Sequence, residues 1–190
     1  MNDEDLEIIA EIRGGNLRRF GTLVDRHKDR AMTLALRLVG TREEAEEVVQ
    51  DSFVKAYDNL HKFRGDSRFS TWFYRILYNA CMTRVQRRKD REVSIEGDIQ
   101  NSGPMAVRDK RDVLLDIEER EMQTILRDEI ARLPFRFRTP VTLFYVQEMS
   151  YEEISEVTGQ PVGTVKTNLF RGRHALRQRM LARVSEENRK

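Results

Sequence analysis

Apolar residues recur at helical spacing along almost the whole chain, and this periodicity constrains the fold more than any other feature. Apolar positions three and four residues apart predict one long helix from Leu17 to Leu38, a second from Arg42 to Leu60, and a third from about Ser70 to Lys89. No segment alternates apolar and polar residues between hairpin turns. The sequence therefore predicts an all-α fold.

The expected helix ends carry their own sequence signals. Gly40 follows the first long helix, where a glycine can adopt the left-handed conformation that closes a helix. Thr41 with Glu44, and Ser150 with Glu153, match the capping-box pattern, in which each residue's side chain bonds the other's backbone N–H. Helices are therefore expected to begin just after Thr41 and Ser150.

The periodicity lapses only between Arg91 and Val113, where small polar residues, glycine and proline replace it. A structureless stretch of this length favours a flexible linker between two small helical domains, residues 1–90 and 114–190. Beyond it, Pro140 is tolerated only within the first turn of a helix, which predicts a helix from about Thr139 to Met149.

The charge is distributed unevenly, although the formal net charge of the whole chain is only +2. Residues 41–63 carry three basic and six acidic side chains, a net charge of −3. Residues 64–91 and residues 161–190 each carry eight basic and two acidic side chains, a net charge of +6. Two separate basic blocks of this kind are typical of contacts with nucleic acid.

Composition excludes several other classes of protein. The chain is 39% hydrophobic and has no run of 18 apolar residues, and its acidic N-terminus is unlike a signal peptide, so we expect a cytoplasmic protein with no membrane insertion. One cysteine, Cys81, and three scattered histidines supply neither a disulfide nor a metal site. We expect no metal, no cofactor and no catalytic residues.

The C-terminal part has the pattern of a helix-turn-helix. A short helix with Ile154 and Val157 on its apolar face ends at Gly159, and a long amphipathic helix follows from Pro161. The opposite face of this helix carries side chains that can read a DNA major groove: Thr164, Lys166, Thr167, Phe170, Arg171 and Arg173. The alternative interpretation is a basic surface helix that packs Phe170 on a neighbouring helix.

Aromatic residues crowd the start of the helix predicted from Ser70. Arg75, Asn79 and Gln86 form a separate polar stripe on this helix. Aromatic rings interleaved with arginine suit single-stranded DNA, because every base offers a face for stacking. An aromatic core beside a solvated basic face explains this pattern equally well.

Two groups of motifs resemble a known family. Residues 49–57, 63–67, 71–76 and Asn79 look like region 2 of an extracytoplasmic-function sigma factor, and residues 150–154 and 161–173 look like its region 4. The sequence departs from the family pattern at Ser155 and Gly172, where alanine is usual, and at Pro140 in the first helix of region 4.

The resemblance implies a transcription initiation factor, often of a stress response, that binds core RNA polymerase, reads the promoter −35 element, melts the −10 element and is held inactive by an anti-sigma factor. Polymerase would bind Glu46, Gln50, Asp51 and Phe53. The single-stranded −10 element would contact Lys55, Phe63, Arg64, Ser67, Phe69, Trp72, Arg75 and Asn79. The double-stranded −35 element would contact the six helix-turn-helix side chains named above.

Two other classes of function fit the sequence less well. A two-domain regulator with a ligand-sensing N-terminal half would need an apolar pocket or a phospho-acceptor site, and would not need a surface formed by Trp72, Arg75 and Asn79. An enzyme would need a nucleophile beside a base, and no motif in the sequence places one there.

Overall fold

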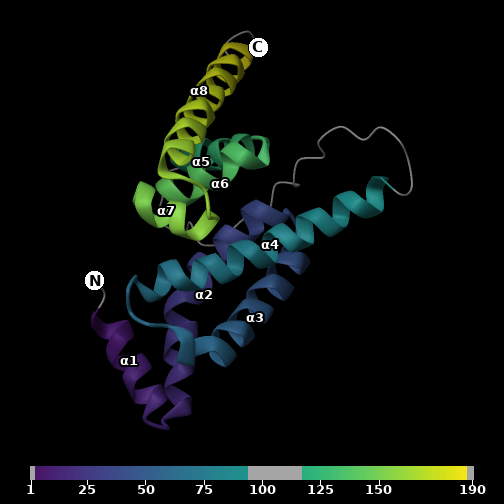
Figure 1. Cartoon of the computed structure of the whole chain (residues 1–190). Helices are drawn as coiled ribbons and strands as arrows, with labels where there is room; N and C mark the ends of the chain where they lie inside the picture. Colours follow the sequence, from purple (N-terminus) through teal and green to yellow (C-terminus); the bar gives the residue numbers. More distant parts are fainter. Residues whose placement is uncertain (1–2, 94–116, 188–190) are drawn as a thin grey trace.

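A computed structural model describes residues 3–93 and 117–187, and all of the regular structure within these ranges is helical. Helices α1–α4 form one group and helices α5–α8 another, and α4 and α7 lie where the two groups meet (Figure 1). The elements are α1 (Asp3–Arg13), η1 (Leu17–Arg19), α2 (Phe20–Val39), α3 (Arg42–Asn59), η2 (Leu60–Lys62), α4 (Phe69–Val93), α5 (Ile117–Ala131), α6 (Phe135–Tyr145), α7 (Tyr151–Thr158) and α8 (Val162–Glu187). The all-α prediction is confirmed.

The predicted helix ends are largely confirmed. Gly40 closes α2 in the left-handed conformation, with a φ of 98°. Ser150 and Glu153 form the complete capping box, with the Ser150 N–H donating to Glu153 Oε2 at 2.8 Å and the Glu153 N–H donating to Ser150 Oγ at 3.1 Å. At α3 only the Thr41 side chain caps the helix, because the Glu44 carboxylate lies within 3.1 Å of the Arg84 guanidinium instead.

The predicted start of the helix around Pro140 is wrong. This helix, α6, begins at Phe135, so Pro140 lies in its interior. Pro134 occupies the N-cap position, and its carbonyl accepts hydrogen bonds from the N–H groups of Phe137 and Arg138, at 2.8 and 2.9 Å. These bonds form the first turn before Pro140 is reached, and burial of the Pro140 ring offsets part of the cost of its missing N–H.

The predicted linker, residues 91–113, lies mostly outside the described residues. The described part of α4 continues to Val93, three residues into that range, and α5 begins at Ile117. The domain boundaries at residues 90 and 114 stay a prediction.

A single hydrophobic core joins the two groups of helices. It contains Leu34, Phe53 and Phe73 from the first group and Leu143 and Ile154 from the second. A smaller cluster, made of Ile130, Leu133, Val141 and Leu169, holds α5, α6 and α8 together. The halves that the sequence separates are therefore packed against each other.

Two side chains at the N-terminal end lie where the sequence did not place them. Leu17, expected on the apolar face of the first long helix, lies in η1 and is 57% exposed. His27, one of the three scattered histidines, is buried in the described structure, with its Nε2 atom 3.1 Å from Asp5 Oδ2. This pair connects α1 with α2.

Among the described helices, none is both long and apolar enough to cross a membrane.

Candidate nucleic-acid interface

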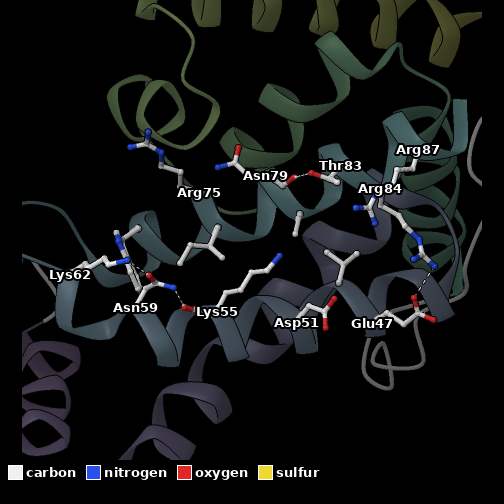
Figure 2. Close-up of a pocket in the computed structure, with 14 residues that line it drawn as sticks. Glu47, Asp51, Lys55, Asn59, Lys62, Arg75, Asn79, Thr83, Arg84 and Arg87 are labelled. Atoms are coloured by element: carbon white, nitrogen blue, oxygen red, sulfur yellow. Dashed lines mark hydrogen bonds and ion pairs between the residues drawn. The ribbon is translucent and has the colours of Figure 1, made fainter. Parts of the chain in front are cut away.

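A groove of about 560 Å³ runs between α3 and α4 on the side of α4 that faces away from helices α5–α8 (Figure 2). Its walls come mainly from polar side chains of both helices. The lining residues are Glu47, Val48, Asp51, Lys55, Asn59, Lys62, Trp72, Arg75, Ile76, Asn79, Ala80, Thr83, Arg84 and Arg87.

The groove brings together five of the residues predicted from the sequence: Asp51, Lys55, Trp72, Arg75 and Asn79. Figure 2 shows the Lys55 side chain extending from α3 toward α4, while Arg75 and Asn79 follow each other along α4. Residues four apart share one face of a helix, which explains why these two polar groups lie side by side. One surface therefore carries a residue predicted to bind polymerase and four predicted to bind DNA.

The sequence did not predict Asn59, Lys62 and Thr83, which also line the groove. Arg87, a further basic residue of α4, lines it as well. A spacing of four residues continued from Asn79 leads to Thr83 and then Arg87, so the period of the stripe could have identified Thr83. Lys62 Nζ donates to Asn59 Oδ1 at 2.7 Å, which holds its positive charge at one end of the groove.

The other end of the groove is closed by ion pairs between α3 and α4. Arg84 lies 3.1 Å from Glu44 Oε1 and 2.8 Å from Glu47 Oε2. The hydrogen bond to Glu44 is the largest cause of a raised pKa at Arg84. The Arg84 guanidinium is already paired with two carboxylates. The basic side chains of the groove that can bind a ligand are therefore those of Lys55, Lys62, Arg75 and Arg87.

Three predicted contact residues lie in the core, which corrects their assignment. Phe53 is 7% exposed and stacks on Phe73, with ring centroids 4.4 Å apart. Phe63 and Phe69 are 3% and 2% exposed and pack edge to face at 5.9 Å. The family resemblance predicted that these three side chains contact polymerase or DNA. In the structure their rings face inward and fill the space between helices. The interpretation of these aromatic residues as core is the correct one.

The remaining predicted residues of this half do not line the groove. Glu46 and Gln50 are exposed on α3, and Glu46 forms an ion pair with Arg42 at 2.8 Å. Arg64 is exposed and Ser67 half-buried, both in the segment between η2 and α4. Their proposed roles stay predictions.

The second candidate surface is the helix-turn-helix of α7 and α8. Gly159 turns the chain with a φ of 68°, and Ser155 Oγ donates to the Gln160 carbonyl at 2.6 Å. Ser155 stands where alanine is usual in the family, and its hydroxyl holds the turn. Val165 and Leu169 bury the inner face of α8.

The outer face of α8 is open to solvent at every position predicted to read DNA: Thr164, Lys166, Thr167, Phe170, Arg171 and Arg173 are all exposed. Phe170 is 70% exposed, so its ring does not pack on a described helix as the alternative interpretation required. Lys166 Nζ lies 5.4 Å from the centre of the Tyr151 ring, an arrangement that positions the ammonium beside the start of α7.

Part of the basic block at the C-terminus has a structural role. Glu129 on α5 is buried, and its carboxylate lies 3.2 Å from Arg183 and 3.8 Å from Arg179, both on α8. These contacts orient α8 against α5. The arginines nearer the start of α8, at 171 and 173, point their charge at solvent instead.

Known proteins resemble this chain along both halves. The Sigma-70 region 2 model matches residues 23–91, and the Sigma-70 region 4 model matches residues 123–176. The ECF RNA polymerase sigma factor SigW of Bacillus subtilis (strain 168) is 32% identical over 180 residues, which span 90% of this chain and 94% of the relative. The RNA polymerase sigma-H factor of Pseudomonas aeruginosa is 35% identical and covers 92% of each chain.

Solved structures show the same fold. The sigma factor RpoE of Bartonella quintana, in complex with the anti-sigma factor NepR, gives a TM-score of 0.69 at 22% identity and covers 84% of this chain and 94% of that one. CnrH, in complex with the cytosolic domain of CnrY, gives a TM-score of 0.66 at 24% identity and covers 92% and 96%.

The groove, the helix-turn-helix and the two matched regions define a transcription initiation factor of the sigma-70 class. Within that class, the chain belongs to the extracytoplasmic-function family. It is an alternative sigma factor that associates with core RNA polymerase and directs initiation at specific promoters.

Proposed function

We propose that the two exposed surfaces divide promoter recognition between them. The groove between α3 and α4 holds the displaced single strand of the −10 element, and the outer face of α8 reads the −35 element in the major groove. The observation that carries this proposal is the gathering of Lys55, Arg75 and Asn79 in one groove, beside the partly exposed indole of Trp72.

The groove has the chemical features that a single strand needs. Lys55, Lys62 and Arg75 supply positive charge for the phosphates. The Asn79 amide can form hydrogen bonds with the edge of a base, and the Trp72 ring offers a face for stacking. In this proposal Phe63 and Phe69 hold the segment that carries Arg64 and Ser67, and they contact DNA only through that support.

The face of α8 suits reading of a double-stranded element. Arg171 and Lys166 reach base edges or phosphates, Thr164 and Thr167 contact base edges more weakly, and Phe170 lies against thymine methyl groups. Arg173, further along the helix, contacts the backbone. The exposure of all six side chains in the described structure supports this assignment.

Polymerase binds the exposed side of α3 in this proposal. Glu46, Gln50 and Asp51 supply polar groups there, and Val54, which is 60% exposed, supplies the apolar surface in place of the buried Phe53. Exposed apolar residues beside charged ones are typical of protein interfaces.

The polymerase assignment is tested with Asp51→Arg. Reversing this exposed charge should weaken assembly with core polymerase more than about tenfold, which corresponds to about 1.4 kcal/mol of binding free energy. The fold should survive, since exposed substitutions usually change stability by only about 0.5 kcal/mol. Core binding is measured by fluorescence anisotropy, with Asp58→Arg, an exposed residue of α3 outside the groove, as the control. Unchanged affinity in a folded Asp51→Arg sample would contradict the assignment.

The −10 assignment is tested with Asn79→Ala in run-off transcription and permanganate footprinting. Loss of a hydrogen bond to a melted base should lower open-complex formation by about tenfold, while closed-complex binding changes little. Thr83→Ala, one turn further along the same groove, provides a milder neighbour for comparison. If closed-complex binding fell and melting did not, Asn79 would not contact the single strand.

Regulation by an anti-sigma factor completes the proposal. Two solved structures of the same fold are complexes, one of RpoE with the anti-sigma factor NepR and one of CnrH with the cytosolic domain of CnrY. We further propose that the chain acts in the cytoplasm and has no catalytic activity of its own. Among the described residues no cluster of histidine, cysteine and carboxylate side chains could hold a metal ion.

A further inference from the structure

Helix α1 is fixed within the first group of helices and ends before residue 23, where the match to the Sigma-70 region 2 model begins. Its apolar face is buried, since Ile8, Ile9 and Ile12 are at most 5% exposed. On its polar side, Glu4 Oε2 lies 2.7 Å from the Arg26 guanidinium of α2. The helix therefore has a defined position from which it can support other parts of the molecule.

The last residue of α1, Arg13, reaches the segment that follows α3. Its Nη2 atom donates to the Leu60 carbonyl at 2.9 Å and also to the Phe63 carbonyl. These carbonyls lie at the two ends of the short helix η2, and the last C=O groups of a helix have no partner within the helix. One guanidinium from α1 therefore satisfies carbonyl groups about 50 residues away in the sequence.

The segment from residue 64 to residue 68 connects η2 with α4 and has little regular structure. In the described structure, no backbone–backbone hydrogen bond involves residues 64–67. Arg64, Asp66 and Arg68 are exposed, and Gly65 and Ser67 between them are half-buried. The position of this segment therefore depends on contacts at its ends and along its inner side.

Two contacts with α1 lie at the start of the segment. The Phe63 carbonyl that accepts from Arg13 belongs to the same planar peptide unit as the Arg64 N–H, so the guanidinium orients the backbone from which Arg64 extends. One residue further on, Gly65 has a φ of 82°, and a Cβ atom built there would lie 3.8 Å from Leu6 Cδ2. The chain therefore turns directly beside α1.

Trp72 connects the same segment with the groove between α3 and α4. Its ring centroid lies 5.4 Å from that of Phe63 and 5.8 Å from that of Phe69, the residues that flank the segment. Trp72 also lines the groove. A displacement of Phe63 would therefore change the surroundings of a side chain that the proposed single strand contacts.

We propose that Arg13 is a positioning residue for recognition of the −10 element. By binding the Leu60 and Phe63 carbonyls, it keeps the segment that carries Arg64 and Ser67 in one position beside Trp72, and it does not contact DNA itself. The inference rests on the proposed assignment of Arg64 and Ser67 to the −10 element. Without the guanidinium the segment takes several positions, and discrimination between bases decreases because it depends on a preorganised contact surface.

The first test uses the free protein and needs no DNA. Trp72 is the only tryptophan of the chain, so its fluorescence reports on the aromatic contacts at the base of the segment. Acrylamide should quench this fluorescence about twofold more strongly in Arg13→Ala than in the parent chain, because the segment opens locally. Arg13→Lys, which can still donate to a carbonyl, should restore most of the protection. Arg18→Ala, which removes an exposed arginine of η1, is the control and should behave like the parent.

Circular dichroism accompanies this test. Arg13→Ala should stay folded, because the isoleucine face of α1 remains buried. Loss of the fold would show that Arg13 has a general structural role and would overturn the proposal. Equal quenching of the folded variant and the parent would overturn it as well, because the segment would then not depend on Arg13.

The second test measures base preference in transcription. Two templates share the −35 element and the spacer and differ in one −10 base, with the better template taken from promoters that the parent holoenzyme selects. Arg13→Ala should reduce the ratio of the two run-off transcripts by about fivefold, while affinity for core polymerase stays unchanged. Lower stability alone would reduce both transcripts alike, so an unchanged ratio would overturn the positioning role.

Arg64→Ala and Ser67→Ala separate this inference from the proposed function. If these variants change the ratio and Arg13→Ala does not, the −10 assignment stands and the role of Arg13 is wrong. If none of the three changes the ratio, the assignment of the segment to the −10 element is itself wrong, and the inference fails with it. A changed ratio in all three variants, restored in part by Arg13→Lys, is the result that we expect.

Discussion

At the scale of single residues, the absence of a side chain at Gly172 allows α8 to pack closely against α6. A Cβ atom built on Gly172 would lie 2.8 Å from Val141 Cγ2 and 3.3 Å from Phe137 Cβ, both on α6. The departure from the alanine usual in the family therefore has a physical reason, because α6 and α8 approach closely at this point.

Gly172→Ala should lower the free energy of unfolding by about 1 kcal/mol, because overpacking costs roughly 1–3 kcal/mol and the gain in helix propensity offsets only about 1 kcal/mol of it. Gly163→Ala in the same helix is the control, since a Cβ there meets no atom within 4 Å. Urea denaturation measures both. In a Val141→Ala background the penalty at 172 should disappear, and its persistence there would show that Val141 is not the obstacle.

At the scale of elements, the two capping sequences differ in what they contribute. At the start of α7, the Ser150 and Glu153 side chains each accept a hydrogen bond from the other residue's backbone N–H. At α3 only the Thr41 side chain accepts such a bond, from the Glu44 N–H at 3.3 Å, because the Glu44 carboxylate forms an ion pair with Arg84. Ser150→Ala should therefore destabilise the protein by about 1 kcal/mol, and Thr41→Ala by less. Thermal unfolding followed by circular dichroism compares the two, and an equal loss would show that the second bond of the box contributes nothing.

At the scale of the whole molecule, the predicted linker from Arg91 to Val113 sets how far the halves can part. A flexible chain of about 23 residues spans roughly 25 Å on average and about 80 Å when fully extended. Deleting about four residues should leave the preferred promoter spacing unchanged. Two promoter elements about 17 base pairs apart, the spacing typical of the family, are separated by about 58 Å at 3.4 Å per step. Deleting about twelve residues leaves a reach of roughly 40 Å, which is shorter than this separation, so transcription should fail. A preferred spacing that shortens with each deletion would show that the linker itself measures the distance.

The sequence by itself determined the features that depend on neighbouring residues. Helical periodicity, the Gly40 and Gly159 caps and the Ser150 capping box are local signals, and they predicted the all-α fold and the helix-turn-helix. The exposed face of α8 followed from the same periodicity, because its buried stripe was already visible in Val165 and Leu169.

Only the tertiary structure decided which side chains face a partner helix. Phe53, Phe63 and Phe69 matched the motif of a binding surface and became core, because burial depends on helices that lie far away in the sequence. The groove and the contact of α6 and α7 with α2 and α4 have the same origin, since each needs faces of several helices brought together by long-range contacts. Local sequence patterns carry no information on the distance between such faces. The contact between α4 and α7 could therefore be seen only in the folded molecule.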